Sequence, residues 1–114
     1  MAENKLTKEE LQERITQAPF HKWLGLNIVE MNDDGIKVSV GWREEFVVNP
    51  KGGYTHGGIL ATIIDVAADY ALAAKLGAPI PTVDLRVDYH RAAMEGELLV
   101  EAKVIKMGRT FSTA

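Results

Sequence analysis

Apolar and polar residues alternate along several stretches of the chain, and each such stretch predicts a half-buried strand. The clearest is residues 36 to 43, in which Ile36, Val38, Val40 and Trp42 alternate with polar or small residues. The Asp-Gly pair at the end of residues 32 to 35 suits a tight hairpin turn before this strand. Further strands are predicted at residues 24 to 31, 83 to 90 and 97 to 107, and a last one begins at 110.

Two other stretches carry helical patterns. Residues 6 to 18 predict a short amphipathic helix that Thr7 and Glu10 open as a capping box and that Pro19 ends. Residues 56 to 76 predict a long helix whose apolar positions lie on most of its circumference, so most of it must be covered. Gly77 can end it in the left-handed conformation.

This order predicts an α+β fold with an antiparallel sheet curved around one long central helix. We expect a single domain over residues 1–114, in which residues 1–20 form an N-terminal helical segment. The last predicted strand stops almost where it begins, so C-terminal strands of the fold are expected to be truncated.

Composition narrows the class of function. A formal charge of -3 gives no general attraction to nucleic acid or to an anionic membrane, so neither is an expected partner. The chain has no cysteine and no histidine pair at ligand spacing, so no metal site is expected. The polar, acidic N-terminus differs from a signal peptide, and the predicted location is cytoplasmic.

The carboxylates Asp65 and Asp69 lie within the apolar helix, where an unpaired charge is expensive to bury. Asp65 comes nine positions after His56, which opens the helix together with two glycines. The Asp-containing helix is preceded by Asn49-Pro50 and followed by Thr82-Val83-Asp84-Leu85 and then Tyr89. This pattern resembles the hotdog-fold acyl-CoA thioesterases of the phenylacetate-degradation (PaaI-like) type.

The resemblance implies a role for each residue of the pattern. Asp65 would attack the thioester carbonyl or activate a water, and these alternatives remain open. Gly57 would offer its N–H to the oxyanion, and Gly58 would keep the acyl tunnel clear. His56 would orient the loop or polarise the thioester. Asn49 would position the water or the turn formed by His56 and the two glycines, and Thr82 would help to hold the attacking water. Arg91, Lys106 and Arg109 would contact the phosphates of coenzyme A.

Helix geometry requires more than one subunit for this chemistry. Nine residues at about 1.5 Å rise place Asp65 about 13 Å from His56, too far for both to act on one thioester. The resemblance implies that paired subunits share each site, so a homodimer is expected at minimum and a homotetramer, as a dimer of dimers, is expected beyond it. Coenzyme A would be part of the substrate, and no separate cofactor is expected.

Three functions fit this outline to different degrees. The leading prediction is an acyl-CoA thioesterase, and the alternative is a non-catalytic acyl-CoA-binding module, which needs no carboxylate at the thioester. A dehydratase would want an Asp/His pair within one loop, which is absent here. Of the other titratable residues, Asp69 is expected at a solvated edge or paired with a cation, and His21 and His90 are expected on the surface.

Overall fold

The computed structural model describes residues 3–114, and its N-terminal part contains two short helices. Helix α1 spans Lys8–Ile15, and the predicted capping box is present, with Thr7 accepting from the Glu10 N–H and the Glu10 side chain accepting from the Thr7 N–H. The predicted helix over 6 to 18 is shorter than expected, and the prediction that Pro19 ends it was wrong, because α1 already ends at Ile15. Pro19 is the first residue of a second helix, α2, Pro19–Leu24, because a proline at the first helical position lacks only an N–H that would be unpaired anyway.

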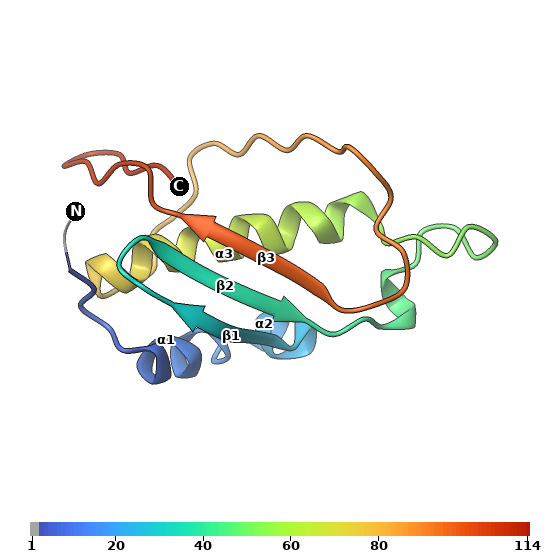
Figure 1. The fold of residues 1–114 in the computed structure, drawn as a ribbon, viewed down its shortest axis with the longest axis horizontal. Helices are drawn as coiled ribbons and strands as arrows, with labels where there is room; N and C mark the ends of the chain where they lie inside the picture. Colours follow the sequence, from blue (N-terminus) through green and yellow to red (C-terminus); the bar gives the residue numbers. More distant parts are fainter. Residues whose placement is uncertain (1–2) are drawn as a thin grey trace.

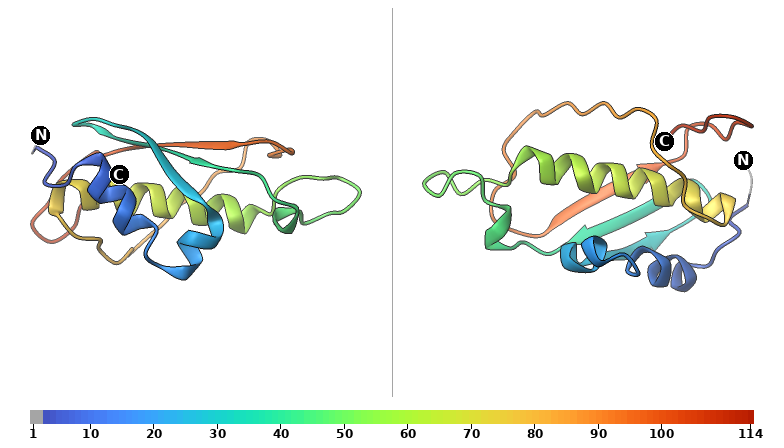
Figure 2. Two further views of the ribbon diagram at one scale, coloured as in Figure 1. Left: turned by 90° about the horizontal axis from the view of Figure 1, so that it is seen from below. Right: turned by 180° about the vertical axis from the view of Figure 1, so that it is seen from behind.

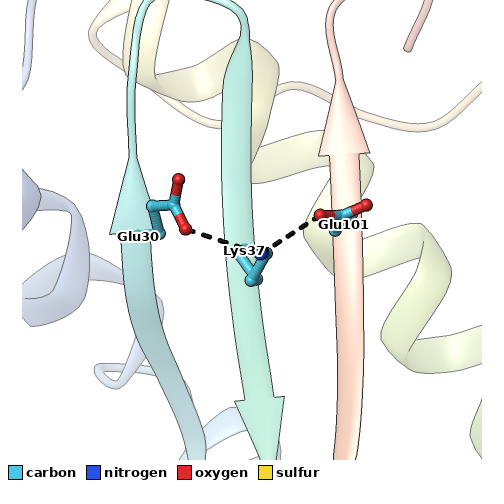
Figure 3. A network of polar contacts seen from close by, with 3 residues as sticks. All are labelled: Glu30, Lys37 and Glu101. Carbon is cyan, nitrogen blue, oxygen red and sulfur yellow. Dashed lines mark ion pairs between the residues drawn. The ribbon is translucent and has the colours of Figure 1, made fainter.

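Three strands form an antiparallel sheet in the order β1-β2-β3: Leu26–Met31, Gly35–Val40 and Leu98–Lys103. The first two confirm the predicted hairpin, and the third confirms the central part of the strand expected at 97 to 107. All three helices lie on one face of this sheet (Figures 1 and 2). The opposite face carries an ion-pair ladder across the three strands, in which Lys37 lies 3.5 Å from Glu30 and 3.2 Å from Glu101 (Figure 3). The hydrogen bond to Glu101 and the charge of Glu30 raise the pKa of Lys37.

The long helix α3, Gly57–Leu76, confirms the central prediction, and its cap residues are His56 and Gly77. It packs against β2 and β3, while α1 packs against β1 and the C-terminal half of α3. Between β2 and α3 the chain makes a 3-10 turn, η1, at Glu44–Phe46, which buries Phe46 completely. The core consists of apolar side chains from these elements, among them Leu11, Ile15, Leu24, Ile28, Val38, Val40, Ile63, Ala67 and Ala73.

Residues 83 to 90 do not form the predicted strand. They are extended, but among residues 3–114 no strand pairs with them, and they run beside α3 on the side away from β1 and β2 (Figure 1). A cavity of about 290 Å³ is lined by residues 87 to 91, by β3 and by α3, and this part of the segment forms no ladder with β3. The alternating pattern therefore indicated an extended conformation correctly but not a pairing.

The chain after β3 is also less regular than expected. The strand expected from residue 110 is reduced to an isolated antiparallel bridge between Lys106 and Thr113. None of the helices in the described residues is long and apolar enough to cross a membrane.

The antiparallel sheet wrapped around the long helix, with a short helix before it, confirms the expected hotdog arrangement.

Candidate functional site

The N-terminus of α3 presents one unpaired backbone donor. The His56 side chain caps the helix, because its Nδ1 accepts from the Gly58 N–H at 2.7 Å. The backbone carbonyl of His56 accepts from Ile59 at 3.0 Å and from Leu60 at 3.3 Å. Among residues 3–114 the Gly57 N–H has no acceptor, so it is the group at this positive helix end that is free to bind an anionic oxygen.

Tyr89 is held against this turn, a contact that the sequence did not reveal. Its hydroxyl donates to the Gly57 carbonyl at 2.8 Å. A Cβ at Gly57 would lie 3.4 Å from the Tyr89 ring, an ordinary contact distance, so the ring packs directly on this turn. Tyr89 lies 32 positions after Gly57, so local sequence could not predict the contact. The one signal in the sequence was that Tyr89 belongs to the motif pattern described above.

The structure gives a local reason for a glycine at position 58, which the sequence alone did not indicate. A Cβ at this position would lie 2.9 Å from Nδ1 of His56, closer than real Cβ atoms approach another atom. The small residue therefore leaves room for the imidazole to cap the helix.

Asp65 and Thr82 meet halfway along the helix. The Thr82 hydroxyl donates to Oδ1 of Asp65 at 2.6 Å, a short hydrogen bond between the two side chains. Asp65 is half-buried on α3, and Thr82 is exposed in the extended segment that follows the helix. The structure thus brings together two of the residues singled out from sequence.

Asp69 corrects an expectation, because it is half-buried rather than at a solvated edge, and within residues 3–114 it forms no ion pair with a Lys or Arg. It is half-buried, and its Oδ1 accepts from the backbone N–H of Ile80 at 3.1 Å. Burial raises the pKa of Asp69, and the nearby charge of Asp65 raises it further, while the Ile80 N–H and His21 act in the opposite direction. His21 is likewise not a surface residue, since it is half-buried, lies 3.0 Å from the Ile15 carbonyl through Nδ1 and packs edge-on against Tyr70.

The loop from η1 to α3 projects from the body of the molecule (Figures 1 and 2). Asn49 organises its tip, because its Oδ1 accepts from the N–H groups of Lys51 and Gly52 at 3.0 and 3.2 Å. Gly53 has a φ of 69°, in the left-handed region that favours glycine, and donates to the Asn49 carbonyl. Within residues 3–114 the Asn49 side chain therefore bonds only to its own turn.

The three cations expected to meet coenzyme A are exposed and lie on two separate segments, one before β3 and one after it. Arg91 borders the cavity near the start of α3, where the neighbouring Ala93 carbonyl accepts from Thr55. Lys106 and Arg109 follow β3 toward the opposite end of α3 (Figure 1). Within residues 3–114 no group of three or more His, Asp or Glu side chains is arranged to hold a metal ion.

The comparisons with known families, sequences and structures all point to thioesterases or esterases. The model of the family described as the thioesterase superfamily matches residues 52–114, more than half of the chain. A Halobacterium salinarum protein with a provisional assignment as an esterase is 33% identical over 109 residues, covering 91% of this chain and 72% of that protein. Acyl-coenzyme A thioesterase 13 of Mus musculus is 36% identical over 66 residues, covering 56% of this chain and 47% of that protein. An X-ray structure of a thioesterase-superfamily protein matches with a TM-score of 0.87 at 45% identity, covering 90% of this chain and 77% of that one.

Proposed function

Since the chain belongs to the thioesterase superfamily, we propose that it is an acyl-CoA thioesterase, which hydrolyses a thioester to a carboxylic acid and free coenzyme A. The observation that carries this proposal is the hydrogen bond from Thr82 to Asp65 on the central helix. It places a carboxylate beside a hydroxyl on a surface where water can reach both. The partial match to an acyl-coenzyme A thioesterase supports the choice of substrate class.

In the proposed reaction Asp65 acts on a water that Thr82 helps to hold. Asp65 takes a proton from the water, and the water oxygen forms a bond to the thioester carbon. The carbonyl then re-forms as the C–S bond breaks, and the departing thiolate of coenzyme A takes up a proton. Direct attack by Asp65, followed by hydrolysis of the resulting anhydride, is the alternative route.

The Gly57 N–H would stabilise the oxyanion that forms in either route. It is unpaired and lies at the positive end of a 20-residue helix, which suits a developing negative charge. His56 would serve this donor indirectly, because its cap on Gly58 holds the first turn of the helix in place. Asn49 would fix the preceding loop through its own turn, since that is where its side chain is bonded.

The remaining assignments are part of the same proposal. The site would be shared between the Gly57 end of one subunit and Asp65 of another, in a homodimer that pairs further into a homotetramer. Arg91, Lys106 and Arg109 would contact the phosphates of coenzyme A, and Gly58 would leave space for the acyl chain. No cofactor beyond the substrate is proposed, and the proposed location is the cytoplasm.

The test is hydrolysis of a panel of aliphatic and aryl acyl-CoA compounds by the wild type and by Asp65→Asn. The amide keeps the shape of the side chain but is a poor base and nucleophile, so kcat should fall by at least about 100-fold while binding of a non-hydrolysable acyl-CoA analogue is retained. If Asp65→Asn kept more than about a tenth of kcat, a barrier change under about 1.4 kcal/mol, Asp65 would not be the essential group. A wild type that binds acyl-CoA without turnover would support the non-catalytic binding module instead.

The shared site can be tested by mixing two inactive variants. Gly57→Ala meets the Tyr89 ring at an ordinary contact distance of 3.4 Å, but its methyl group would lie beside the N–H proposed to bind the oxyanion and hinder approach of the thioester carbonyl, so it should harm the rate. A mixed dimer of Gly57→Ala with Asp65→Asn would regain one intact site if the two residues come from different subunits. Absence of recovery in a dimer shown by light scattering to be mixed would indicate that each site lies within one chain.

A further inference from the structure

The segment that carries Thr82 is fixed to α3 at two points. Asp69 accepts from the Ile80 N–H at 3.1 Å, and Asp65 accepts from the Thr82 hydroxyl at 2.6 Å. Asp65 and Asp69 are four positions apart, so both lie on one face of the helix, one turn from each other. The segment therefore runs antiparallel to the helix and contacts successive turns of it.

The two contacts match in spacing. Four residues of α-helix rise by about 6 Å, and two residues of extended chain span about 6.6 Å. Hence a segment held at Ile80 by Asp69 carries its residue 82 to the level of Asp65 without further adjustment. Ile80 adds an apolar anchor, since its side chain packs against the core.

The prolines on either side of Ile80 leave it as the one backbone donor of residues 79 to 81 and restrict the conformation of the chain there. Pro79 and Pro81 flank Ile80 and have no N–H, so Ile80 supplies the only backbone donor of the three residues. A residue before proline is also confined to extended conformations, so little freedom remains between Ile80 and Thr82. Fixing the Ile80 N–H therefore fixes the place of the Thr82 hydroxyl.

Electrostatics alone would not favour Asp69 at this position. A second carboxylate one turn from Asp65 on the same helix face is repelled by it, and partial burial disfavours the charge further. The Ile80 N–H and the nearby His21 offset these effects only in part, since the pKa of Asp69 remains raised.

We infer that Asp69 is a positioning residue for the proposed reaction, which holds Ile80 so that the Thr82 hydroxyl meets Asp65. This role rests on the proposed function for its effect on turnover, but the placement itself is a property of the folded chain. Asp69 does not touch the substrate; it acts through Thr82.

Two substitutions separate the hydrogen bond from the charge. Asp69→Ala removes the acceptor for the Ile80 N–H, whereas Asp69→Asn keeps an oxygen acceptor and removes the charge. Asp84→Asn, at an exposed carboxylate in the same segment, is the matched control. We expect kcat to fall between about 10-fold and 100-fold in Asp69→Ala, because small misplacements of reacting groups have effects of this size. In Asp69→Asn and Asp84→Asn it should stay within about threefold of the wild type, with KM little changed throughout.

A double-mutant cycle with Thr82→Val tests whether Asp69 acts through Thr82. Once the hydroxyl is absent, Asp69→Ala should have little further effect on kcat. A loss that is equally large in the Thr82→Val background, or an Asp69→Asn variant as slow as Asp69→Ala, would overturn the inference.

An activity-free measurement keeps this inference distinct from the proposed function. By NMR, amide exchange at Ile80 should accelerate in Asp69→Ala only, and the Thr82 methyl resonance should shift in Asp69→Ala and in Asp65→Asn but not in Asp69→Asn or Asp84→Asn. If the wild type hydrolyses no acyl-CoA, the proposed function fails while these spectra still decide the placement. Unchanged Ile80 exchange and an unchanged Thr82 resonance in Asp69→Ala would overturn the placement, whatever the activity.

Discussion

Replacing His56 with alanine should lower the free energy of unfolding by the contribution of one N-cap hydrogen bond. Gly58 would lose the acceptor that it now finds at 2.7 Å on Nδ1, whereas Ile59 and Leu60 would keep theirs on the backbone carbonyl of residue 56. The His56 side chain is exposed, so its removal gives up little apolar burial. The expected loss is therefore that of an N-cap, about 1 kcal/mol within a range of about 0.5 to 2.

This loss is large enough to measure. In a domain of this size about 1 kcal/mol lowers Tm by roughly 4 °C and changes the folding equilibrium by about fivefold. His56→Asn is the control, because asparagine is among the strongest N-caps and should hold the unfolding free energy within about 0.5 kcal/mol of the wild type. Urea and thermal unfolding of the three proteins would measure the difference, and His56→Ala unfolding at the wild-type midpoint would refute the argument.

The same pair of variants separates two roles for His56 in catalysis. Because Nδ1 accepts a hydrogen bond, the neutral ring carries its proton on Nε2, which asparagine cannot reproduce in the same place. If His56 acts by holding the first turn of α3, His56→Asn should keep at least about a third of the wild-type kcat while His56→Ala loses about 10-fold. An asparagine variant as slow as the alanine variant would mean that the imidazole itself contacts the substrate.

Two further predictions concern the sheet and the pH dependence of stability. A Cβ at Gly35 would overlap the Ala102 carbonyl of the adjacent strand, so Gly35→Ala should destabilise the chain by about 1 to 3 kcal/mol; Gly41→Ala, with nothing near its Cβ, should change it by less than about 0.5 kcal/mol in the same urea titration. Burial and the neighbouring carboxylate raise the pKa of Asp69 above its ordinary 3.8, so the folded chain binds this proton more tightly than the unfolded chain does. The free energy of unfolding therefore falls as the pH rises from the pKa of the unfolded chain to the higher pKa of the folded chain. Asp69→Asn lacks this loss, and its Tm relative to the wild type should increase between about pH 4 and pH 7; a difference that stays constant over this range would contradict the assignment.

The sequence was sufficient to predict those helices and strands that are determined by residues close to one another in the chain. Thr7 and Glu10 mark the start of α1 because both halves of a capping box are formed by residues three positions apart. Pro19 was misjudged because a proline ends one helix and opens another equally well, and the sequence does not say which. The strands of the first hairpin were predictable since their alternation and their turn agree.

The segment after α3 could not be predicted because its placement depends on contacts distant in sequence. Alternation at residues 83 to 90 indicates an extended chain with two unlike faces, but ladder pairing also requires a neighbouring strand, and none within residues 3–114 pairs with this segment. For the same reason Asp69 was assigned to a solvated edge, since its acceptor role depends on a backbone N–H eleven positions later.

What holds this segment instead are side-chain contacts to the helix, and these involve the residues on which the proposed reaction depends. Asp69 binds Ile80, Asp65 binds the Thr82 hydroxyl, and Tyr89 binds the Gly57 carbonyl at the start of the helix. Two of the groups proposed to act on a thioester, the Asp65 carboxylate and the first turn of the helix at Gly57, therefore also take part in holding this segment. Substitutions along this line of contacts should alter turnover and the order of the segment together, whereas substitutions on the opposite face of the sheet, such as those at Lys37, should alter neither.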